Sequence, residues 1–352
     1  MRLRAHTAHF KIRMDWFLLE KKALGREGVS RADALAVLSA GPDGLSSALA
    51  AAFTVRRHHW GRGVNLHVLC NAKSGMCREN CAFCSQAIGA YSGVDRYGMM
   101  SVDELVAGAH AAHARDAVKY CMVTATRGPS EEELSVICEA ARRIKNDINI
   151  HLCASLGLLT RDQARQLKEA GIDRFNHNLE SSGRFYPEIC QTHTWEDRVQ
   201  TIRHAREAGM EACCGGIMGM GETLEDRVEL AFALRELAVE SIPVNFLDPR
   251  PGTPLMDRSR IDPVDALLSL CMFRMVNPSR DIRVAGGREV CLRSLQPLAL
   301  YPANSMFTEG YLTTPGQGES RDLEMIRDAG FFVSRIEEDV PEPELRDPVS
   351  HV

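Results

Sequence analysis

The sequence of 352 residues lacks the features that define several broad classes of protein. Its longest apolar runs, such as Ala48–Phe53, fall far short of the roughly 20 residues that a membrane-spanning helix needs. Neither sign of charge is in excess, because 42 Lys and Arg residues face 47 Asp and Glu residues, for a formal net charge of −5. This balance offers no electrostatic footprint for nucleic acid or a membrane surface, and we expect neither as a partner.

We expect no secretory signal, because no apolar segment of that kind follows the basic start at residues 1–13. The start carries no acidic residue before Asp15, which is typical of a mitochondrial transit peptide. It lacks the Ser-rich composition of such a peptide, however. We therefore expect a cytoplasmic protein, with a mitochondrial address as the alternative. The composition, 45% apolar and 25% charged, excludes a disordered chain.

From residue 65 onward, short β-rich runs alternate with segments of helical apolar spacing. No GxGxxG fingerprint follows a strand, which disfavours an open doubly wound sheet. Eight strand–helix units predict an α/β fold of the (β/α)8 TIM-barrel type, with function at the C-terminal ends of parallel strands. The expected strands are Asn65–Cys70, Val118–Thr124, Ile148–Cys153, Asp173–Asn178, Met210–Ile217, Ser241–Leu247, Asp281–Ala285 and about Asn304–Tyr311.

The expected helices begin at recognisable caps, in which a Ser or Thr precedes an acidic residue by three positions. We expect residues 1–60 to form a helical extension with a loop signal at residues 41–44, residues 61–335 to form the barrel, and residues 336–352 to form an acidic flexible tail. The four cap pairs are Ser101 with Glu104, Ser130 with Glu133, Thr194 with Asp197, and Thr223 with Asp226.

Twelve cysteines are few for a disulfide scaffold of this length and many for a cytosolic chain. Three of them, Cys77, Cys81 and Cys84, share one loop directly after the first expected strand. Three soft thiolates suit zinc or an iron–sulfur cluster. A structural zinc site usually takes four ligands as two Cys pairs, and the chain has no second CxxC pair, which favours the cluster.

The loop SGMCRENCAFCSQ resembles the radical S-adenosylmethionine superfamily, whose hallmark is a CxxxCxΦC loop after the first strand of a barrel. The resemblance implies a 4Fe–4S cluster on Cys77, Cys81 and Cys84 that leaves one iron open to S-adenosylmethionine. In that superfamily, reductive cleavage of the cofactor releases a 5′-deoxyadenosyl radical.

Six sequence blocks extend the resemblance to the biotin synthases, which insert sulfur between two unactivated carbons of dethiobiotin. The resemblance implies this substrate, a homodimer, and a reductant protein such as flavodoxin or ferredoxin. A related barrel enzyme of the hydrogenase-maturase or methylornithine synthase type, and a non-enzymatic iron–sulfur carrier or sensor, are the alternatives. The blocks are NAKSGMCRENCAFCSQ, FNHNLESS, CCGGIMGMGET, VNFLDPRPGTPL, RVAGGRE and ANSMFTEGYLTTPGQ.

In the biotin synthases, an auxiliary 2Fe–2S cluster donates the sulfur. The positions that match its ligands are Cys121, Cys153, Cys213 and Arg283, each on an expected strand. Without the resemblance, buried cysteines are equally small hydrophobic residues. Arg283 is an unusual ligand because a guanidinium has no lone pair to offer, and hydrogen bonding to cluster sulfides is the alternative.

Cys213 and Cys214 are adjacent, and successive strand residues point to opposite faces. Only one of them can face the barrel interior, and the resemblance favours Cys213 unless a bulge at the following glycines changes the choice. The extra thiol leaves the type of auxiliary cluster open. We assign the remaining cysteines to the core or to chance: Cys70, Cys138, Cys190, Cys271 and Cys291.

Polar residues near later strand ends complete the site that the resemblance implies. Asn178 would lie between the substrate and S-adenosylmethionine, and Glu180, at a position that is often Asp, would contact the ribose hydroxyls. Asn245 would bind the ureido ring of dethiobiotin, and Thr313 and Thr314 its carboxylate tail. Without the resemblance, such Asn and Thr residues are equally turn residues.

Overall fold

The computed structural model describes residues 14–308, 310–312 and 314–334. Its parallel strands close into an eight-position barrel, because β1 pairs with both β2 and β9, and the predicted (β/α)8 fold is confirmed. The fifth position is divided between two short strands, β5 and β6. The barrel strands are β1 (Gly63–Lys73), β2 (Lys119–Thr124), β3 (His151–Ser155), β4 (Arg174–Asn176), β5 (Glu211–Cys213), β6 (Gly216–Met218), β7 (Ser241–Phe246), β8 (Asp281–Val284) and β9 (Ser305–Phe307).

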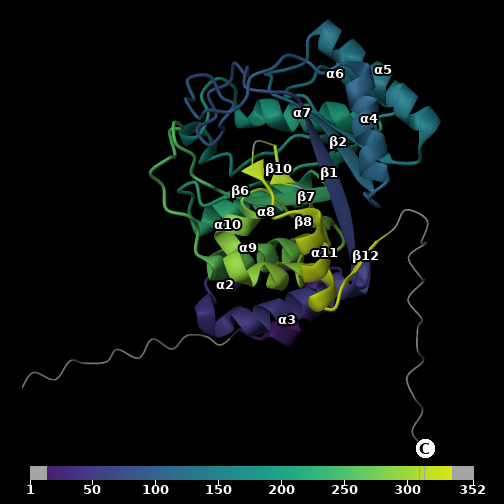
Figure 1. Cartoon of the computed structure of the whole chain (residues 1–352). Helices are drawn as coiled ribbons and strands as arrows, with labels where there is room; N and C mark the ends of the chain where they lie inside the picture. The colour runs from purple at the N-terminus through teal and green to yellow at the C-terminus, as the bar shows by residue number, and fades with distance from the viewer. Residues whose placement is uncertain (1–13, 309, 313, 335–352) are drawn as a thin grey trace, which may run out of the picture.

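Helices surround the barrel, as Figure 1 shows. Strands β7 and β8 are buried throughout, as expected for parallel strands covered on both faces. The surrounding elements are α4 (Val102–His113), α5 (Glu131–Asp147), α6 (Arg161–Glu169), η1 (Tyr186–Glu188), α7 (Trp195–Glu207), α8 (Leu224–Glu236), α9 (Pro263–Val276), α10 (Arg288–Leu292), η2 (Arg293–Leu300) and α11 (Glu319–Asp328). The short strands β10 (Gly310–Tyr311) and β11 (Thr314–Pro315) pair with each other, and β12 (Phe332–Val333) pairs with the start of β1.

All four predicted helix caps are present as capping boxes, at the starts of α4, α5, α7 and α8. In each, the Ser or Thr side chain accepts from the backbone N–H three residues on, and the acidic side chain accepts from the backbone N–H of the cap. These pairs fix where each helix starts, and therefore the length of the loop that precedes it at the functional end of the barrel.

Three N-terminal helices cover the other end of the barrel: α1 (Trp16–Leu24), α2 (Arg31–Leu38) and α3 (Gly41–Trp60). Helix α3 packs against α9, and Figure 1 shows it at the end opposite the long dark blue loop of residues 74–100. The fully buried Arg56 joins α3 to the barrel, because its guanidinium donates to the carbonyl oxygens of Ala303 at 3.3 Å and Gly63 at 2.6 Å.

The predicted loop at residues 41–44 is wrong. Helix α3 begins at Gly41, and Pro42 lies in its first turn, where the missing N–H of proline costs no hydrogen bond. The chain turns at Ser39 and Ala40 instead. The predicted tail and the basic start lie outside the described residues. Within the described part of the chain, no helix combines the length and apolar character needed to cross a membrane.

Candidate active site

A cavity of about 290 Å³ lies at the C-terminal ends of the barrel strands. Its wall includes the three cysteines of the loop after β1, together with polar residues that follow β4 and lie on β7. The sequence-predicted residues that line it are Cys77, Cys81, Cys84, Cys121, Asn178, Glu180 and Asn245.

All three cysteines of the loop after β1 line this cavity. The backbone N–H of Glu79 lies 3.5 Å from Sγ of Cys77, and the backbone N–H of Gln86 lies 3.4 Å from Sγ of Cys84. Burial raises the pKa of both thiols, that of Cys84 to about 11, and these backbone donors oppose the shift by favouring the thiolate form that a metal cluster requires. The loop therefore fits a cluster with three cysteine ligands.

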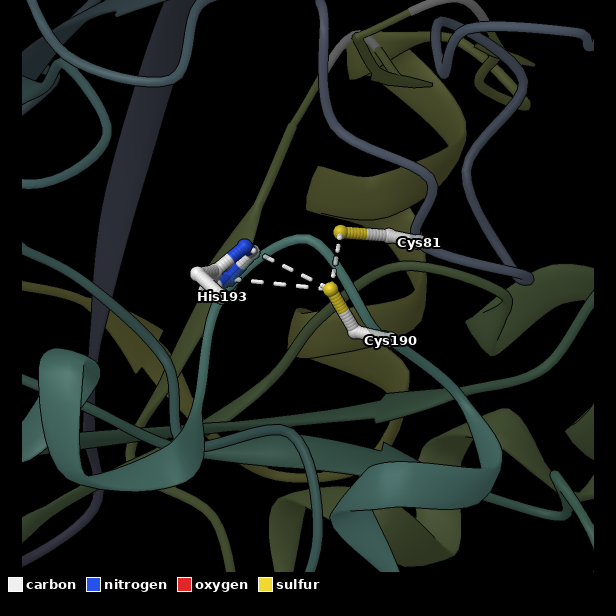
Figure 2. Close-up of side chains that lie close together, drawn as sticks. All are labelled: Cys81, Cys190 and His193. Atoms are coloured by element: carbon white, nitrogen blue, oxygen red, sulfur yellow. Dashed lines mark hydrogen bonds between the residues drawn. The ribbon is translucent and has the colours of Figure 1, made fainter.

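The segment between η1 and α7 packs against this loop, where the backbone N–H of Ala82 donates to the carbonyl of Ile189 at 2.8 Å. Figure 2 shows that the segment brings Cys190 and His193 to Cys81. The two Sγ atoms are 3.8 Å apart, and Nδ1 of His193 is 3.4 Å from Sγ of Cys190. Cys190 belongs to a small buried core cluster, as expected for a core thiol, and its thiol also contacts a candidate cluster ligand.

Arg198 of α7 is a buried cation at the cavity wall. Its guanidinium donates to the carbonyl oxygen of Asn178 at 2.7 Å and lies 3.4 Å from Oε1 of Glu180. Burial raises the pKa of Glu180, and Arg198 opposes this shift. Within the described residues, Oε2 of Glu180 is buried without a hydrogen-bond partner, so this oxygen can accept from a ligand hydroxyl.

Asn178 and Asn245 are held by backbone groups. The Oδ1 atom of Asn178 accepts from the N–H of Gly215 at 3.1 Å. Asn245 donates through Nδ2 to the carbonyl of Gly216 at 3.1 Å and accepts through Oδ1 from the N–H of Gly286 at 2.9 Å. An amide group has two N–H donors and two lone pairs, so Asn245 retains one of each for a ligand.

The last two predicted substrate residues are not placed at the cavity. Thr313 lies outside the described residues, and Thr314 is described only through its backbone pairing with Tyr311 in the β10–β11 hairpin.

A second set of cysteines lies deeper in the barrel. Cys121 on β2 and Cys153 on β3 are paired in register on neighbouring strands. Cys213, at the end of β5, has its Sγ 3.6 Å from Nη1 of Arg283 on β8. Nε of Arg283 is buried without a partner in the described part of the chain, which leaves one donor for a further group in the interior. The residues fit a second, negatively charged cluster.

Cys213 and Cys214 face different surroundings. Cys213 contacts Arg283, whereas Cys214 belongs to the apolar cluster that includes Leu230 of α8. The strand is interrupted between β5 and β6, but only after Cys213. The structure therefore points Cys213 to the barrel interior.

Below these cysteines, a buried carboxylate binds several cationic groups. Asp281 accepts from Oγ of Ser241 at 2.9 Å, and its Oδ2 lies 3.4 Å from both Arg174 and Arg283. Burial alone would raise the pKa of Asp281, but Arg283 and Lys119 hold it well below its usual range. Burial and repulsion by Arg174 lower the pKa of Lys119 to about 8.

Sequence reasoning missed Arg174, Arg198 and Asp281 as site residues. Arg174 lies within one expected strand and Asp281 begins another, and charged residues in the strands of a barrel are a signal for a polar interior. Arg198 carried no such signal, because α7 is rich in charged residues throughout.

The Gly-rich GGIMGMGET block precedes α8, and its closely approachable backbone N–H groups favour an anionic group. The structure shows that the chain supplies this anion itself. The carboxylate of Glu222 accepts from the N–H groups of Gly219 at 2.7 Å, Met220 at 2.8 Å and Gly221 at 3.1 Å, and it pairs with Arg227.

Comparison with solved structures shows which proteins share this fold. A crystal structure of methylornithine synthase superimposes with a TM-score of 0.79 at 18% identity, covering 90% of this chain and 97% of that one. The FeFe-hydrogenase maturase of Carboxydothermus hydrogenoformans gives a TM-score of 0.77 at 18% identity, covering 91% and 79%. At this identity, the likeness concerns the fold alone.

Sequence comparison is more specific. Residues 73–234 match the Radical SAM superfamily, and residues 243–332 match the Biotin and Thiamin Synthesis associated domain. The biotin synthase of Salinibacter ruber is 56% identical, covering 93% of this chain and 91% of the relative, and that of Rhodopirellula baltica is 48% identical, covering 90% and 88%. The biotin synthase of Bacillus cytotoxicus is 43% identical, covering 91% and 97%. With this identity over nearly its whole length, the chain belongs to the biotin synthase family of radical S-adenosylmethionine enzymes.

Proposed function

We propose that the chain converts dethiobiotin into biotin with two iron–sulfur clusters, one bound near the mouth of the barrel and one deeper inside it. The observation that carries the proposal is the placement of the cavity: its wall contains both the three-cysteine loop and Cys121 of the deeper set. The 4Fe–4S ligands would be Cys77, Cys81 and Cys84, and the auxiliary 2Fe–2S ligands Cys121, Cys153, Cys213 and Arg283.

When bound, the reduced 4Fe–4S cluster with S-adenosylmethionine supplies a hydrogen-abstracting radical, and the auxiliary cluster supplies sulfur. The protein contributes binding and orientation. Glu180 would accept from a ribose hydroxyl through its unpartnered Oε2, and Arg198 keeps the carboxylate in place. The arginine also offsets part of the charge of Glu180, which reduces the cost of burying that carboxylate.

The substrate would lie between the two cysteine sets. The cyclic urea of dethiobiotin offers both donors and acceptors, and Asn245 retains one donor and one acceptor position for it. Asn178 is fixed by Gly215 and reaches the same cavity, so it can contact substrate and cofactor together. Thr313 and Thr314 would hold the carboxylate tail, as the family resemblance implies.

At the deeper end, the protein fixes the direction of Arg283. Ser241 accepts from Nη2 of this arginine at 2.7 Å, and Asp281 lies 3.4 Å away. With these contacts, Nη1 stays directed toward Cys213. The surplus of cationic groups around the three thiols would balance the negative charge of a cluster bound there.

The test is anaerobic reconstitution with iron and sulfide, reduction by a flavodoxin or ferredoxin system, and measurement of both biotin and 5′-deoxyadenosine. Cys77→Ser should abolish both products. Cys153→Ser should abolish biotin and leave deoxyadenosine formation. Cys138→Ser, a matched change of a buried thiol on α5, should retain both. Deoxyadenosine without biotin from the wild-type chain would overturn the proposal.

A further inference from the structure

Cys81, Cys190 and His193 form a cluster of metal-binding side chains that the proposed chemistry does not require. Their sulfur and nitrogen atoms all lie within 4.8 Å of one another, and all three residues are buried. Figure 2 shows the three side chains pointing toward one another from two separate segments of the chain. Cys81 belongs to the three-cysteine loop, whereas Cys190 and His193 lie between η1 and α7.

Two of the three ligand separations match those around a tetrahedral metal ion. Two sulfur atoms that are each about 2.3 Å from a tetrahedral zinc ion lie about 3.8 Å apart, and a sulfur and an imidazole nitrogen lie about 3.6 Å apart. The observed separations are 3.8 Å between the Sγ atoms of Cys81 and Cys190 and 3.4 Å between Sγ of Cys190 and Nδ1 of His193. Cys190 can therefore share an ion with either neighbour at the observed spacing, and the third pair, Cys81 and His193, lies within 4.8 Å.

Backbone contacts hold the two segments in this arrangement. The N–H of Ala82, next to Cys81, donates to the carbonyl of Ile189, next to Cys190, at 2.8 Å. After Cys190 in the chain, the N–H groups of Gln191 and Thr192 donate to Oδ1 of Asn80 at 3.0 Å and 3.2 Å. Because the neighbours of both cysteines are fixed, little conformational entropy would be lost when an ion binds.

The imidazole is held by hydrogen bonds at both ring nitrogens. Nδ1 of His193 lies 2.5 Å from Oε2 of Glu79 and donates its proton to that carboxylate, and Nε2 accepts from Nε of Arg198 at 3.0 Å. To bind an ion through Nδ1, the ring must carry its proton on Nε2 instead, where the hydroxyl of Tyr186, 2.8 Å away, can accept it. A hydrogen bond at the distal nitrogen is the usual way in which a metal-binding histidine is oriented.

We propose that Cys81, Cys190 and His193 bind a single soft divalent ion, of the Zn²⁺ type, when no iron–sulfur cluster is present. Binding converts two thiols into thiolates and releases their two protons to solvent, with no change of oxidation state. The two thiolates and Glu79 carry the negative charges, and they balance the positive charges of the ion and of Arg198. Nη2 of Arg198 lies 3.9 Å from Sγ of Cys81. Because Cys81 is shared, the ion and the 4Fe–4S cluster exclude each other.

The test uses the full chain, freed of iron by chelation under anaerobic conditions and titrated with Co²⁺ as a spectroscopic probe for Zn²⁺. Thiolate-to-Co²⁺ charge transfer in the ultraviolet reports sulfur ligands. Other thiols of the barrel also bind Co²⁺. The readout is therefore the one tightly bound Co²⁺ ion per chain that is lost when a proposed ligand is substituted, called here the tight equivalent. Cys190→Ser should weaken this equivalent at least about tenfold, and His193→Gln should do the same.

The matched control is Cys77→Ser, which alters the same loop but not the proposed ion site, and should leave the affinity unchanged. Loss of the tight equivalent in Cys77→Ser, with retention in Cys190→Ser and His193→Gln, would overturn the proposal, because the loop alone would then bind the ion. A second measurement needs no variant: Zn²⁺ added before iron and sulfide should slow cluster formation in the wild type, and equal rates would contradict a shared Cys81. Neither experiment needs S-adenosylmethionine or dethiobiotin, so neither outcome depends on the proposed reaction.

Discussion

Asp281 and Arg283 lie two residues apart on β8, and Oδ2 of the aspartate is 3.4 Å from Nη2 of the arginine. The same oxygen lies 3.4 Å from Nη1 of Arg174, so one carboxylate serves two buried guanidinium groups. Nη1 of Arg283 in turn points to Cys213. Asp281 therefore neutralises the buried arginines and, through Arg283, also helps to orient the candidate ligands of the auxiliary cluster.

The first prediction concerns Asp281→Asn. The variant keeps the shape of the side chain but leaves both arginines without their shared carboxylate, and loss of one partner of a buried ion pair costs about 3 kcal/mol or more. We expect the free energy of unfolding of the cluster-free chain, measured in urea, to fall by about 3 kcal/mol.

Its control is Asp103→Asn. Asp103 also pairs with an arginine, Arg143, at 2.7 Å, but both side chains are exposed, 83% and 44%. Exposed pairs contribute little because water screens them, so this change should have little effect. Equal losses of stability in the two variants would show that Asp281 does not bear the charge balance described above.

The second prediction separates the adjacent thiols. Cys213→Ser should lower the iron and sulfide content of the reconstituted chain by the amount of the auxiliary cluster, because Cys213 points to Arg283. Cys214→Ser should retain that content and lose about 1 to 3 kcal/mol of stability, because it places a hydroxyl in the apolar cluster around α8. Loss of the cluster only in Cys214→Ser would reverse the assignment.

The third prediction concerns the interruption between β5 and β6. A Cβ atom added at Gly215 would lie 1.9 Å from the carbonyl oxygen of Pro243, so Gly215→Ala must push β7 away. We expect a loss of about 1 to 3 kcal/mol in unfolding free energy. Binding of S-adenosylmethionine should also weaken, because the N–H of Gly215 holds Asn178. Gly98→Ala is the control, since nothing lies within 4 Å of its added Cβ. Equal behaviour of the two variants would contradict the steric account.

The parts of the fold that sequence predicts well depend on residues close together in the chain. The strands recur with a regular spacing, and each capping box joins residues three positions apart, as between Ser101 and Glu104. The wrong loop at residues 41–44 has a local cause as well. Gly and Pro signal a turn, but Pro is equally suited to the first turn of a helix, and the sequence pattern does not separate these cases.

The parts of the site that sequence did not predict depend on distant pairs. Cys81 and Cys190 are 109 residues apart in the chain, and Arg174 and Asp281 are 107 apart. No periodicity connects such residues, because only barrel closure and the packing of loops bring them together. The cysteines of the deeper set were identified only through the family resemblance, since on each strand a buried thiol is as well explained by simple packing.

The last prediction concerns pH and two histidines of the barrel interior. Burial, reinforced by Arg283, holds the pKa of His67 well below its usual value, and burial with Arg198 does the same for His177. Both side chains are therefore neutral in the folded chain, whereas in the unfolded chain they take up protons below about pH 6.5. The unfolded state then binds more protons, so stability must fall as the pH falls.

Between pH 7.5 and 5.5, each such histidine should cost about 1.4 kcal/mol of unfolding free energy. His67→Gln should remove this amount from the pH dependence of the cluster-free chain, as measured by urea unfolding at the two pH values. The control His113→Gln changes an exposed histidine of α4 and should retain the wild-type dependence. If His67→Gln also retained it, His67 would have to be protonated in the folded state, beside Arg283 and with only Asp281, at 4.0 Å, to offset the charge.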